Sequence, residues 1–361
     1  MNKRRIYSNM GESPNASCDI SNTIDLVNNI TATSKHFTTN PLEQQVANIL
    51  WPSLLLFGLF SNISFLYVVA KVPFMRTITN AYLCTLAVAD ILHLLSSITD
   101  QLLRYNWSLV PGDDTHKGLL GCIAIDSINT ISYLESAMLV SLVSLERFLA
   151  ICFPLKHRYV QGARRTGKLI LTSWVISLLL MIMVVLNYSA SIVSFCVIWP
   201  NDVRYSNYPN QIKLCSAHRN ISGLSHQILF PITWNAIWLF IAAFNIFMYV
   251  GIMRRLKHRE SDPALHGSHN ARQNATNVRN QVEKMLVVNG AVFFGAWVFN
   301  ATRLVFVIAF QSGHRLVSPE TEFVFNWVTK VVFVLNSSIN PLVYSVTNAR
   351  YREAFKKAFG M

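Results

Sequence analysis

Charged residues are scarce in this chain. Asp, Glu, Lys and Arg make up only 14% of its 361 residues, whereas 52% are hydrophobic. Ordinary soluble domains carry roughly 25% charged residues. A long alternation of polar and apolar residues is also missing, which argues against a β-barrel. Seven stretches reach the roughly 20 largely apolar residues that a membrane span needs, and so many in one chain argue against a large soluble helical core. We therefore predict an all-α membrane protein, a bundle of seven transmembrane helices. The spans are expected near 47–70, 80–103, 119–145, 168–190, 227–253, 284–310 and 322–346.

The short motifs of several enzyme classes are absent as well. The chain has no GxSxG, no HExxH and no glycine-rich phosphate loop. It has no internal repeat and no matching pair of spans broken by glycine or proline, features that transporters normally show. We therefore expect a protein that is not an enzyme. A multi-pass transporter is kept as an alternative, and the intramembrane acids Asp90, Asp126 and Glu135 leave proton chemistry open.

Acidic residues are few, 18 against 31 Lys and Arg, so the formal net charge is +13. In a soluble protein this excess would point to nucleic acid. Here nineteen of the bases lie around 71–79, 146–168, 254–284 and 347–361, on one side of the predicted membrane, and only ten lie in the loops of the other side. The positive-inside bias places the richer side in the cytosol, against anionic lipids. We expect membrane lipids as partners, no nucleic acid, an extracellular N-terminus and a cytosolic C-terminus.

Three regions follow from this topology. Residues 1–46 are polar and are predicted to be a disordered extracellular segment. Residues 47–346 form the membrane domain, and residues 347–361 carry an amphipathic stripe suited to the inner leaflet. The stripe consists of Tyr351, Ala354, Phe355, Ala358 and Phe359. Three N-glycosylation sequons fall on the predicted outer side, at Asn15, Asn29 and Asn220.

The six cysteines divide by compartment. Cys84 and Cys152 lie in or near spans, where unpaired packing residues are expected. The other four, Cys18, Cys122, Cys196 and Cys215, are on the outer side, where disulfides persist. Connectivity cannot be read from spacing. The bridge we expect ties Cys122, at the outer end of the third span, to Cys215 in the loop 191–226.

Polar side chains inside the spans cost several kcal/mol unless they are partnered, so each is a candidate functional residue. Asp90, Asn62, Ser136, Asn336, Ser337 and Asn340 are predicted at similar depth. Interhelical hydrogen bonds that hold the bundle together are one interpretation. The other is a small-cation site, because one carboxylate with several neutral oxygens suits a hard ion such as Na⁺.

A second polar group is expected closer to the outer surface. Asp126, Arg303 and Lys330 are predicted in the top turns of spans three, six and seven. The residues predicted around them are Asn129, Tyr133, Trp234, Trp238, Asn300 and Trp327. An aromatic cavity with a few convergent charges is typical of a ligand pocket. Snorkelling of the cations to the interface is the alternative.

Several motifs now stand in order along the chain. They are GLFSN at 58–62, LAVAD at 86–90, Cys122 followed by Arg147 in ERF, Trp174, and NPLVY at 340–344. Over roughly 50–358 this pattern resembles the class A (rhodopsin-like) G-protein-coupled receptors. MRTITNAYLCTLAVAD, SLERFLAICFPLKHR and NQVEKMLVVN further resemble the neuropeptide branch, which includes the thyrotropin-releasing-hormone, ghrelin, motilin and neuromedin U receptors.

The resemblance implies a switch at the cytosolic end. Arg147 is expected either folded onto Glu146 by a charge-assisted hydrogen bond or released towards a G protein, and steadied there by tyrosines. The residues implied in switching and coupling are Glu146, Arg147, Pro154, Leu155, Tyr249, Asn340, Pro341 and Tyr344. Trp297 and Phe293 match the family's ligand-sensing position and the turn below it. Asp90, Ser136, Asn336, Ser337 and Asn340 match its sodium-binding set, so Na⁺ at Asp90 is the one cofactor considered.

Departures from the family pattern narrow the function. Phe299 and Ile241 stand where prolines are usual, and Arg279 replaces an acid that braces the arginine, so raised agonist-free activity is expected. If the chain ends at Met361, arrestin would be captured through Ser261, Ser268 and Thr276 of the third cytosolic loop. The favoured ligand is a small neuropeptide, and a small carboxylate or lipid is the alternative. The residues assigned to ligand binding are Asp126, Asn129, Thr130, Tyr133, Asn300, Arg303 and Lys330.

Overall fold

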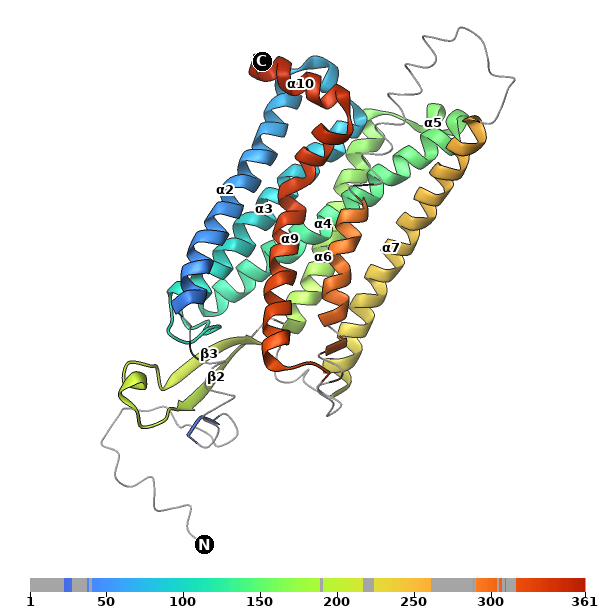
Figure 1. The fold of residues 1–361 in the computed structure, drawn as a ribbon. Coiled ribbons are helices and arrows are strands. Elements are labelled where there is room, and N and C mark those ends of the chain that lie inside the picture. The colour runs from blue at the N-terminus through green and yellow to red at the C-terminus, as the bar shows by residue number, and fades with distance from the viewer. Residues whose placement is uncertain are drawn as a thin grey trace.

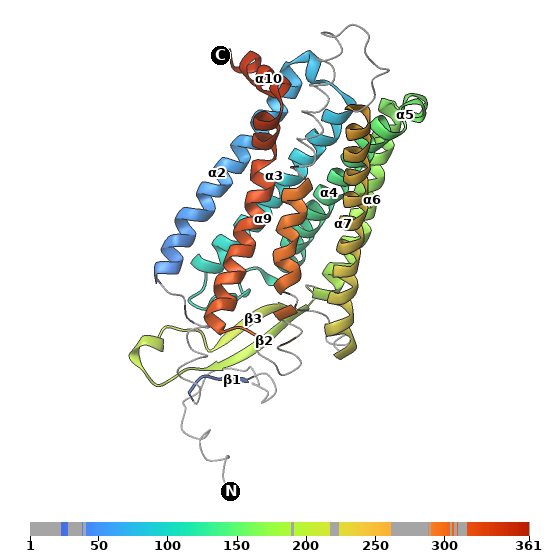
Figure 2. The same cartoon turned by 45° about the vertical axis from the view of Figure 1, so that its right-hand side comes forward.

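The molecule is a bundle of long helices with a strand hairpin at one end and a short helix across the other (Figure 1). The computed structural model describes residues 23–27, 38, 41–188, 191–216, 224–260, 288, 290–303, 305, 306, 309 and 316–360. The view in Figure 2 keeps the hairpin and the C-terminal helix at opposite ends. We call these the hairpin end and the α10 end.

Each predicted span corresponds to helical residues. The long helices are α2 (Pro41–Lys71), α3 (Ile78–Asn106), α4 (Gly118–Cys152), α6 (Ala163–Tyr188), α7 (Leu224–Glu260) and α9 (Pro319–Thr347). The sixth predicted span, 284–310, contains the helical residues 290–303, drawn in orange between α7 and α9 in Figure 1. By length and composition, four described helices are apolar enough to cross a membrane, namely Pro41–Lys71, Ile78–Asn106, Ala163–Leu186 and Trp234–Arg255. Helices α4 and α9, of 35 and 29 residues, are also long enough to cross a membrane.

Two of the long helices are capped by side chains, and two short helices that connect long ones begin with proline. Thr77 accepts the backbone N–H of Asn80 at the start of α3, and Ser318 accepts that of Thr321 at the start of α9. Such caps satisfy backbone donors that the first helical turn leaves free. Proline stands at the first turn of both α5 (Pro154–Val160) and the 3₁₀ helix η2 (Pro73–Met75), where its missing N–H costs nothing.

The bundle buries several polar groups beside its apolar core and exposes large apolar side chains on its outside. Asn62 and Glu135 are fully buried, whereas Phe60 on α2 and Phe240 on α7 are 72% and 74% exposed. A soluble protein rarely exposes so many large apolar side chains. In lipid the same arrangement is favourable, because tails solvate apolar side chains while polar groups must find partners within the bundle.

Glycine permits the closest helix approach near the centre of the bundle. A Cβ on Gly58 would lie 2.5 Å from Leu94 Cδ1 on α3 and 2.6 Å from Ser338 Oγ on α9. One turn further along α2, Asn62 Nδ2 donates to the carbonyl of Ser337 at 3.0 Å. Because Gly58, the first residue of GLFSN, has no side chain, α2, α3 and α9 can meet here.

The hairpin was not predicted. Strands β2 (Ser191–Ile198) and β3 (Gln211–Ser216) pair antiparallel, with Ile192 opposite Cys215, and the short β1 (Thr23–Asp25) adds in parallel beside β2. The 3₁₀ helix η3 (Val203–Tyr205) lies in the connection. Val197 and Ile212 pack with Leu26 and Val110 into a small apolar core below the strands. Part of the segment 1–46, predicted to be disordered, is therefore ordered, since it also contains the start of α2.

Helix α10 (Ala349–Phe359) begins at Asn348, whose side chain accepts the N–H of Arg350, and ends at Gly360 with φ 74°. Its expected stripe is only partly available to lipid. Tyr351, Ala354 and Ala358 are buried in the main core, whereas Phe359 is exposed. Most of the stripe therefore docks α10 on the bundle.

Candidate functional site

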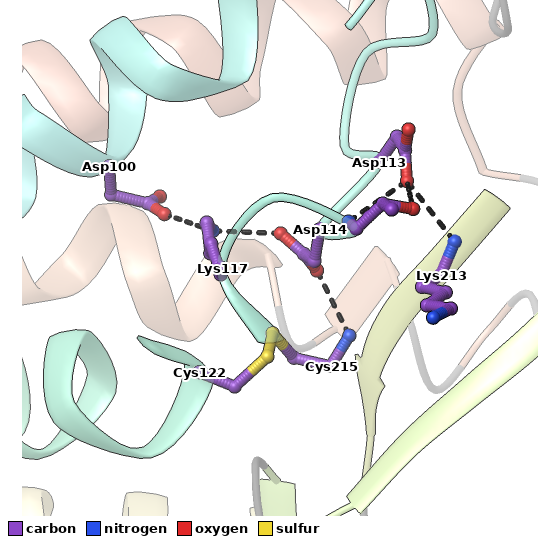
Figure 3. Close-up of a disulfide and its surroundings, with 8 residues drawn as sticks. Asp100, Asp113, Asp114, Lys117, Cys122, Lys213 and Cys215 are labelled. Atoms are coloured by element: carbon purple, nitrogen blue, oxygen red, sulfur yellow. Dashed lines mark hydrogen bonds and ion pairs between the residues drawn. A yellow bond between two sulfur atoms is a disulfide. The ribbon is translucent and has the colours of Figure 1, made fainter. Parts of the chain in front are cut away.

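The hairpin is tied to the bundle by the expected disulfide, Cys122–Cys215, which is confirmed (Figure 3). Asp114 Oδ2 accepts the backbone N–H of Cys215 at 2.9 Å, and Asp113 Oδ1 accepts that of Lys213 at 3.1 Å. Covalent and hydrogen-bonded anchors therefore act on the same six-residue strand. Cys196 is disulfide-bonded as well, whereas Cys84 and Cys152 are not part of a disulfide, as expected.

Charges around this anchor compensate one another. Lys117 forms ion pairs with Asp100 and, at 2.7 Å, with Asp114. Burial would lower the pKa of Lys117, but the two carboxylates hold it above its ordinary value. Burial would likewise raise the pKa of Asp113, but hydrogen bonds from Thr115, the Lys213 backbone and Ser108 hold it below its ordinary value. The connection between α3 and α4 thus holds β3 in place through charged side chains, and we call it the charged clamp.

Aromatic side chains of the predicted pocket meet around Tyr133 on α4. Its ring centroid lies 5.1 Å from Trp238, 5.5 Å from Phe293 and 4.9 Å from Phe333. Trp297 is buried one turn from Phe293 on the same helical segment. Trp327 instead packs on Trp51 and Tyr105, at ring distances of 5.5 Å to each, and belongs to a separate cluster with α2. Trp327 is therefore a packing residue rather than part of the group around Tyr133.

Several polar atoms in this aromatic region lack a partner among the described residues. They are Tyr133 Oη and Trp297 Nε1 and, without a hydrogen bond of normal geometry, both ring nitrogens of His93 and Asn129 Oδ1. His93 and Asn129 are nevertheless near enough to interact with each other. The His93 ring lies 5.7 Å from that of Tyr133. His93 was not singled out from the sequence, although its position three residues after Asp90 places it on the same face of α3. An unpaired buried polar group costs about 1–3 kcal/mol, so these atoms are candidates for hydrogen bonds to a ligand.

Lys330 has a neutral partner. Its Nζ donates to Gln101 Oε1 on α3 at 2.8 Å, and Gln101 Nε2 donates to Asp100 Oδ2 at 3.2 Å. Because Asp100 also pairs with Lys117, a continuous polar chain runs from α9 to the clamp beneath the hairpin. The remaining residues assigned to the ligand, Asp126, Thr130, Asn300 and Arg303, lie at this end and none is fully buried.

The polar centre of the bundle is assembled largely as predicted. Asp90 is almost completely buried; its Oδ1 accepts from Ser136 Oγ at 3.1 Å and its Oδ2 from Asn340 Nδ2 at 2.6 Å. Asn336 and Ser337 are buried in the next turns of α9, and Asn336 Oδ1 has no partner in the described part of the chain. No cluster of three or more His, Cys, Asp or Glu suited to a metal occurs among the described residues, so only the single-carboxylate site is available there.

At the α10 end, Glu146 and Arg147 differ from both expected arrangements. Glu146 Oε1 lies 2.7 Å from His157 Nε2, and its Oε2 accepts from Arg165 at 3.2 Å. Arg147 donates instead to the hydroxyl of Thr79 on α3. Consecutive residues of a helix point in directions about 100° apart, so the two side chains reach different neighbours.

The two tyrosines predicted to steady this arginine have other surroundings. The Tyr249 hydroxyl accepts from Ser144 on α4 at 2.8 Å, and Tyr344 Oη is buried without a partner in the described part of the chain. Pro154 begins α5, and the following Leu155 is 82% exposed. Leu155 is thus exposed on a short helix, and its role in docking stays a prediction.

Glu135 now has partners that the sequence did not identify. Ser173 and Ser177 on α6 donate to its Oε1 and Oε2 at 2.7 and 3.0 Å. The two serines are four residues apart and share one helix face, which is the signal that would have found them. The sequons at Asn15, Asn29 and Asn220, Arg279 and the serines and threonine of the third loop lie outside the described residues.

Comparison with known proteins agrees with this geometry. Residues 61–344 match the model of the 7 transmembrane receptor (rhodopsin family). The thyrotropin-releasing hormone receptor of Mus musculus is 28% identical over 343 residues, covering 88% of this chain and 79% of that protein. The neuromedin U receptor homolog of Caenorhabditis elegans is 25% identical over 324 residues, covering 85% and 77%. The growth hormone secretagogue receptor type 1 of Mus musculus is 27% identical over 317 residues, covering 85% and 79%.

The family match extends from α2 to α9 and includes all the long helices described above. Proteins of this family are multi-pass receptors of the plasma membrane and are not enzymes. The buried polar centre, the disulfide between α4 and β3, and the apolar outer surface are consistent with that architecture. The chain belongs to the rhodopsin family of seven-transmembrane receptors.

Proposed function

We propose that this receptor binds a short peptide at its hairpin end and activates a heterotrimeric G protein at its α10 end. The basic loops favour the α10 end as the cytosolic one, and hence an extracellular N-terminus. The relatives are named as receptors for thyrotropin-releasing hormone, neuromedin U and growth hormone secretagogues. These names support a peptide ligand for this chain, and bases of α10 such as Lys356 and Lys357 support contact with anionic lipids.

The observation that carries a peptide ligand is the mixed set of unpaired polar atoms around Tyr133. Trp297 Nε1 can only donate, Asn129 Oδ1 can only accept, and His93 and Tyr133 can do either. A peptide bond presents one donor and one acceptor side by side. Its amides can therefore satisfy this set, whereas a hydrocarbon ligand would leave every one of these atoms unpaired.

Transmission is a shift between two populations of the receptor, which requires that the agonist bind one of them better. Tyr133 touches Phe293, and the helical segment that carries Phe293 reaches the Tyr249 hydroxyl at Gly290. Movement of this segment opens the α10 end, and Arg147 leaves Thr79 to meet the G protein. Arg279 stands where many members of the family carry an acid that braces the arginine, which favours measurable agonist-free activity.

Replacing Arg147 with alanine tests the G-protein proposal. We expect agonist-driven nucleotide exchange to fall at least tenfold, because the released guanidinium is the group that contacts the G protein. A short-peptide library read by calcium and cAMP in transfected cells supplies the agonist. Arg164→Ala, an exposed arginine of α6, is the control and should leave signalling unchanged. Full exchange by the Arg147→Ala receptor, or solute uptake without exchange in the wild type, would contradict the proposal.

The polar centre fits a sodium ion. Asp90 supplies the one carboxylate, Ser136 a hydroxyl oxygen, and Asn336 a buried carbonyl oxygen that has no partner within the described residues. Hard cations prefer such oxygen sets. A bound ion would supply positive charge beside Asp90 and so stabilise the arrangement in which Asn340 also contacts it.

Sodium should therefore raise the melting temperature of the purified receptor, and the substitution Asp90→Asn should abolish that dependence. A site that is filled at ten times its Kd adds about 1.4 kcal/mol of stability. Melting in NaCl against choline chloride provides the measurement. Glu135→Gln is the matched control, because Glu135 is an equally buried carboxylate satisfied by two serines. Equal sodium effects in the wild type and the Asp90→Asn variant would contradict the ion site.

A further inference from the structure

Cations without acidic partners gather at the hairpin end. Arg104 on α3, Arg303 at the end of the segment 290–303 and Lys330 on α9 form no ion pair with any described residue. Arg104 and Arg303 are both close enough to act on the charge of Lys330. The Nε of Arg104 is buried and lacks a hydrogen-bond partner in the described part of the chain.

Two of the described acids at this end, Asp100 and Asp114, are already engaged. Asp100 pairs with Lys117 and also accepts from Gln101. Asp114 pairs with the same lysine and accepts the N–H of Cys215. The hydrogen-bond partner of Lys330 is the neutral amide oxygen of Gln101, and Asp100, which also acts on its charge, is shared with Lys117. Charge at this end is therefore balanced around Lys117 but not around Lys330.

A partly buried ammonium without an anion is costly, and the cost is removed when a carboxylate approaches it. We propose that the peptide ligand carries a carboxylate, which binds between Lys330 and Arg104 with Arg303 at the rim. This inference rests on the proposed peptide-receptor function and names the chemistry of its ligand. Either the C-terminal carboxylate of the peptide or an Asp or Glu side chain can supply the group.

The spacing along α3 limits the length of the ligand. Gln101 is hydrogen-bonded to Lys330 and therefore lies at the same depth in the bundle. It follows His93 by eight residues, which corresponds to about 12 Å of helix at 1.5 Å per residue. An extended peptide advances about 3.3 Å per residue. A carboxylate at Lys330 therefore lies about three or four residues from the peptide group that reaches His93 and Tyr133.

Short peptides of three to five residues in matched forms test the proposal. One library ends in free carboxylates and the other in amides, and each is made with and without Asp or Glu. Activation is read by calcium and cAMP in cells expressing the wild type, Lys330→Gln or Lys330→Arg at equal surface levels. We expect the active members to carry a carboxylate. Lys330→Gln should raise their half-maximal concentration at least tenfold, while Lys330→Arg should change it less than threefold.

The four peptide forms identify the source of the carboxylate. Loss of activity on amidation assigns it to the C-terminus, and loss on replacing Asp or Glu by Asn or Gln assigns it to a side chain. Removing the carboxylate and introducing Lys330→Gln together should cost no more than either change alone, because both break one contact. Potent activation by peptides lacking any carboxylate, unaffected by Lys330→Gln, overturns the acidic ligand alone. Activation by no peptide at all overturns the peptide-receptor function with it.

Discussion

Replacing Cys215 with serine is expected to lower the melting temperature of the purified receptor by roughly 10 °C. The bridge to Cys122 joins residues separated by 93 positions, and closing a loop of that length is worth roughly 4–5 kcal/mol in the chain-entropy model. The hydrogen bonds from the β3 backbone to Asp113 and Asp114 remain in the variant. The hairpin should therefore loosen rather than detach, and agonist potency should fall with it.

Two further variants separate the bridge from general damage. Cys84→Ser removes a free thiol of α3 and should have little effect. Cys122→Ser, Cys215→Ser and the double variant should melt at the same temperature, because each removes one and the same bond. A double variant much less stable than either single variant would mean that the two sulfurs act separately, against the bridge.

Replacing Gly290 with alanine should raise agonist-free signalling about tenfold. The added Cβ would lie 1.9 Å from the Tyr249 hydroxyl, which also accepts from Ser144. Overpacking of this kind costs about 1–3 kcal/mol, and the penalty applies only while α7 and the segment 290–303 touch. The population consequently shifts to the open state. Each 1.4 kcal/mol changes the ratio of open to closed receptor by a factor of ten.

The same helical segment provides the control. A Cβ on Gly295 meets no heavy atom within 4 Å, so Gly295→Ala gives the same gain in helix propensity without the clash. Nucleotide exchange without peptide, measured at equal surface expression, should rise for Gly290→Ala and stay at the wild-type level for Gly295→Ala. A fall for Gly290→Ala would show that Tyr249 needs this close contact in the open state.

The proposed transmission of the signal from the hairpin end to the G protein depends on contacts between helices at three levels of the bundle. Lys117 and Gln101 connect the hairpin to Lys330, the aromatic group around Tyr133 connects α4 to the segment 290–303, and Tyr249 connects that segment to α4 again. Each connection joins residues on different helices. Substitutions at one level are therefore expected to couple energetically with those at the next.

The sequence alone determined the helical membrane bundle and the positions of its spans, and it indicated the Cys122–Cys215 bridge and a polar centre around Asp90, whose contacts the structure then supplied. Apolar length and charge bias are local properties of a segment, so they can be read from the sequence without knowing which helices pack together. Only the tertiary structure decided that Glu146 contacts His157 and Arg165, that Arg147 contacts Thr79, and that Glu135 is held by α6. These pairs depend on the rotation and register of packed helices, where a difference of one residue turns a side chain by about 100° towards another neighbour.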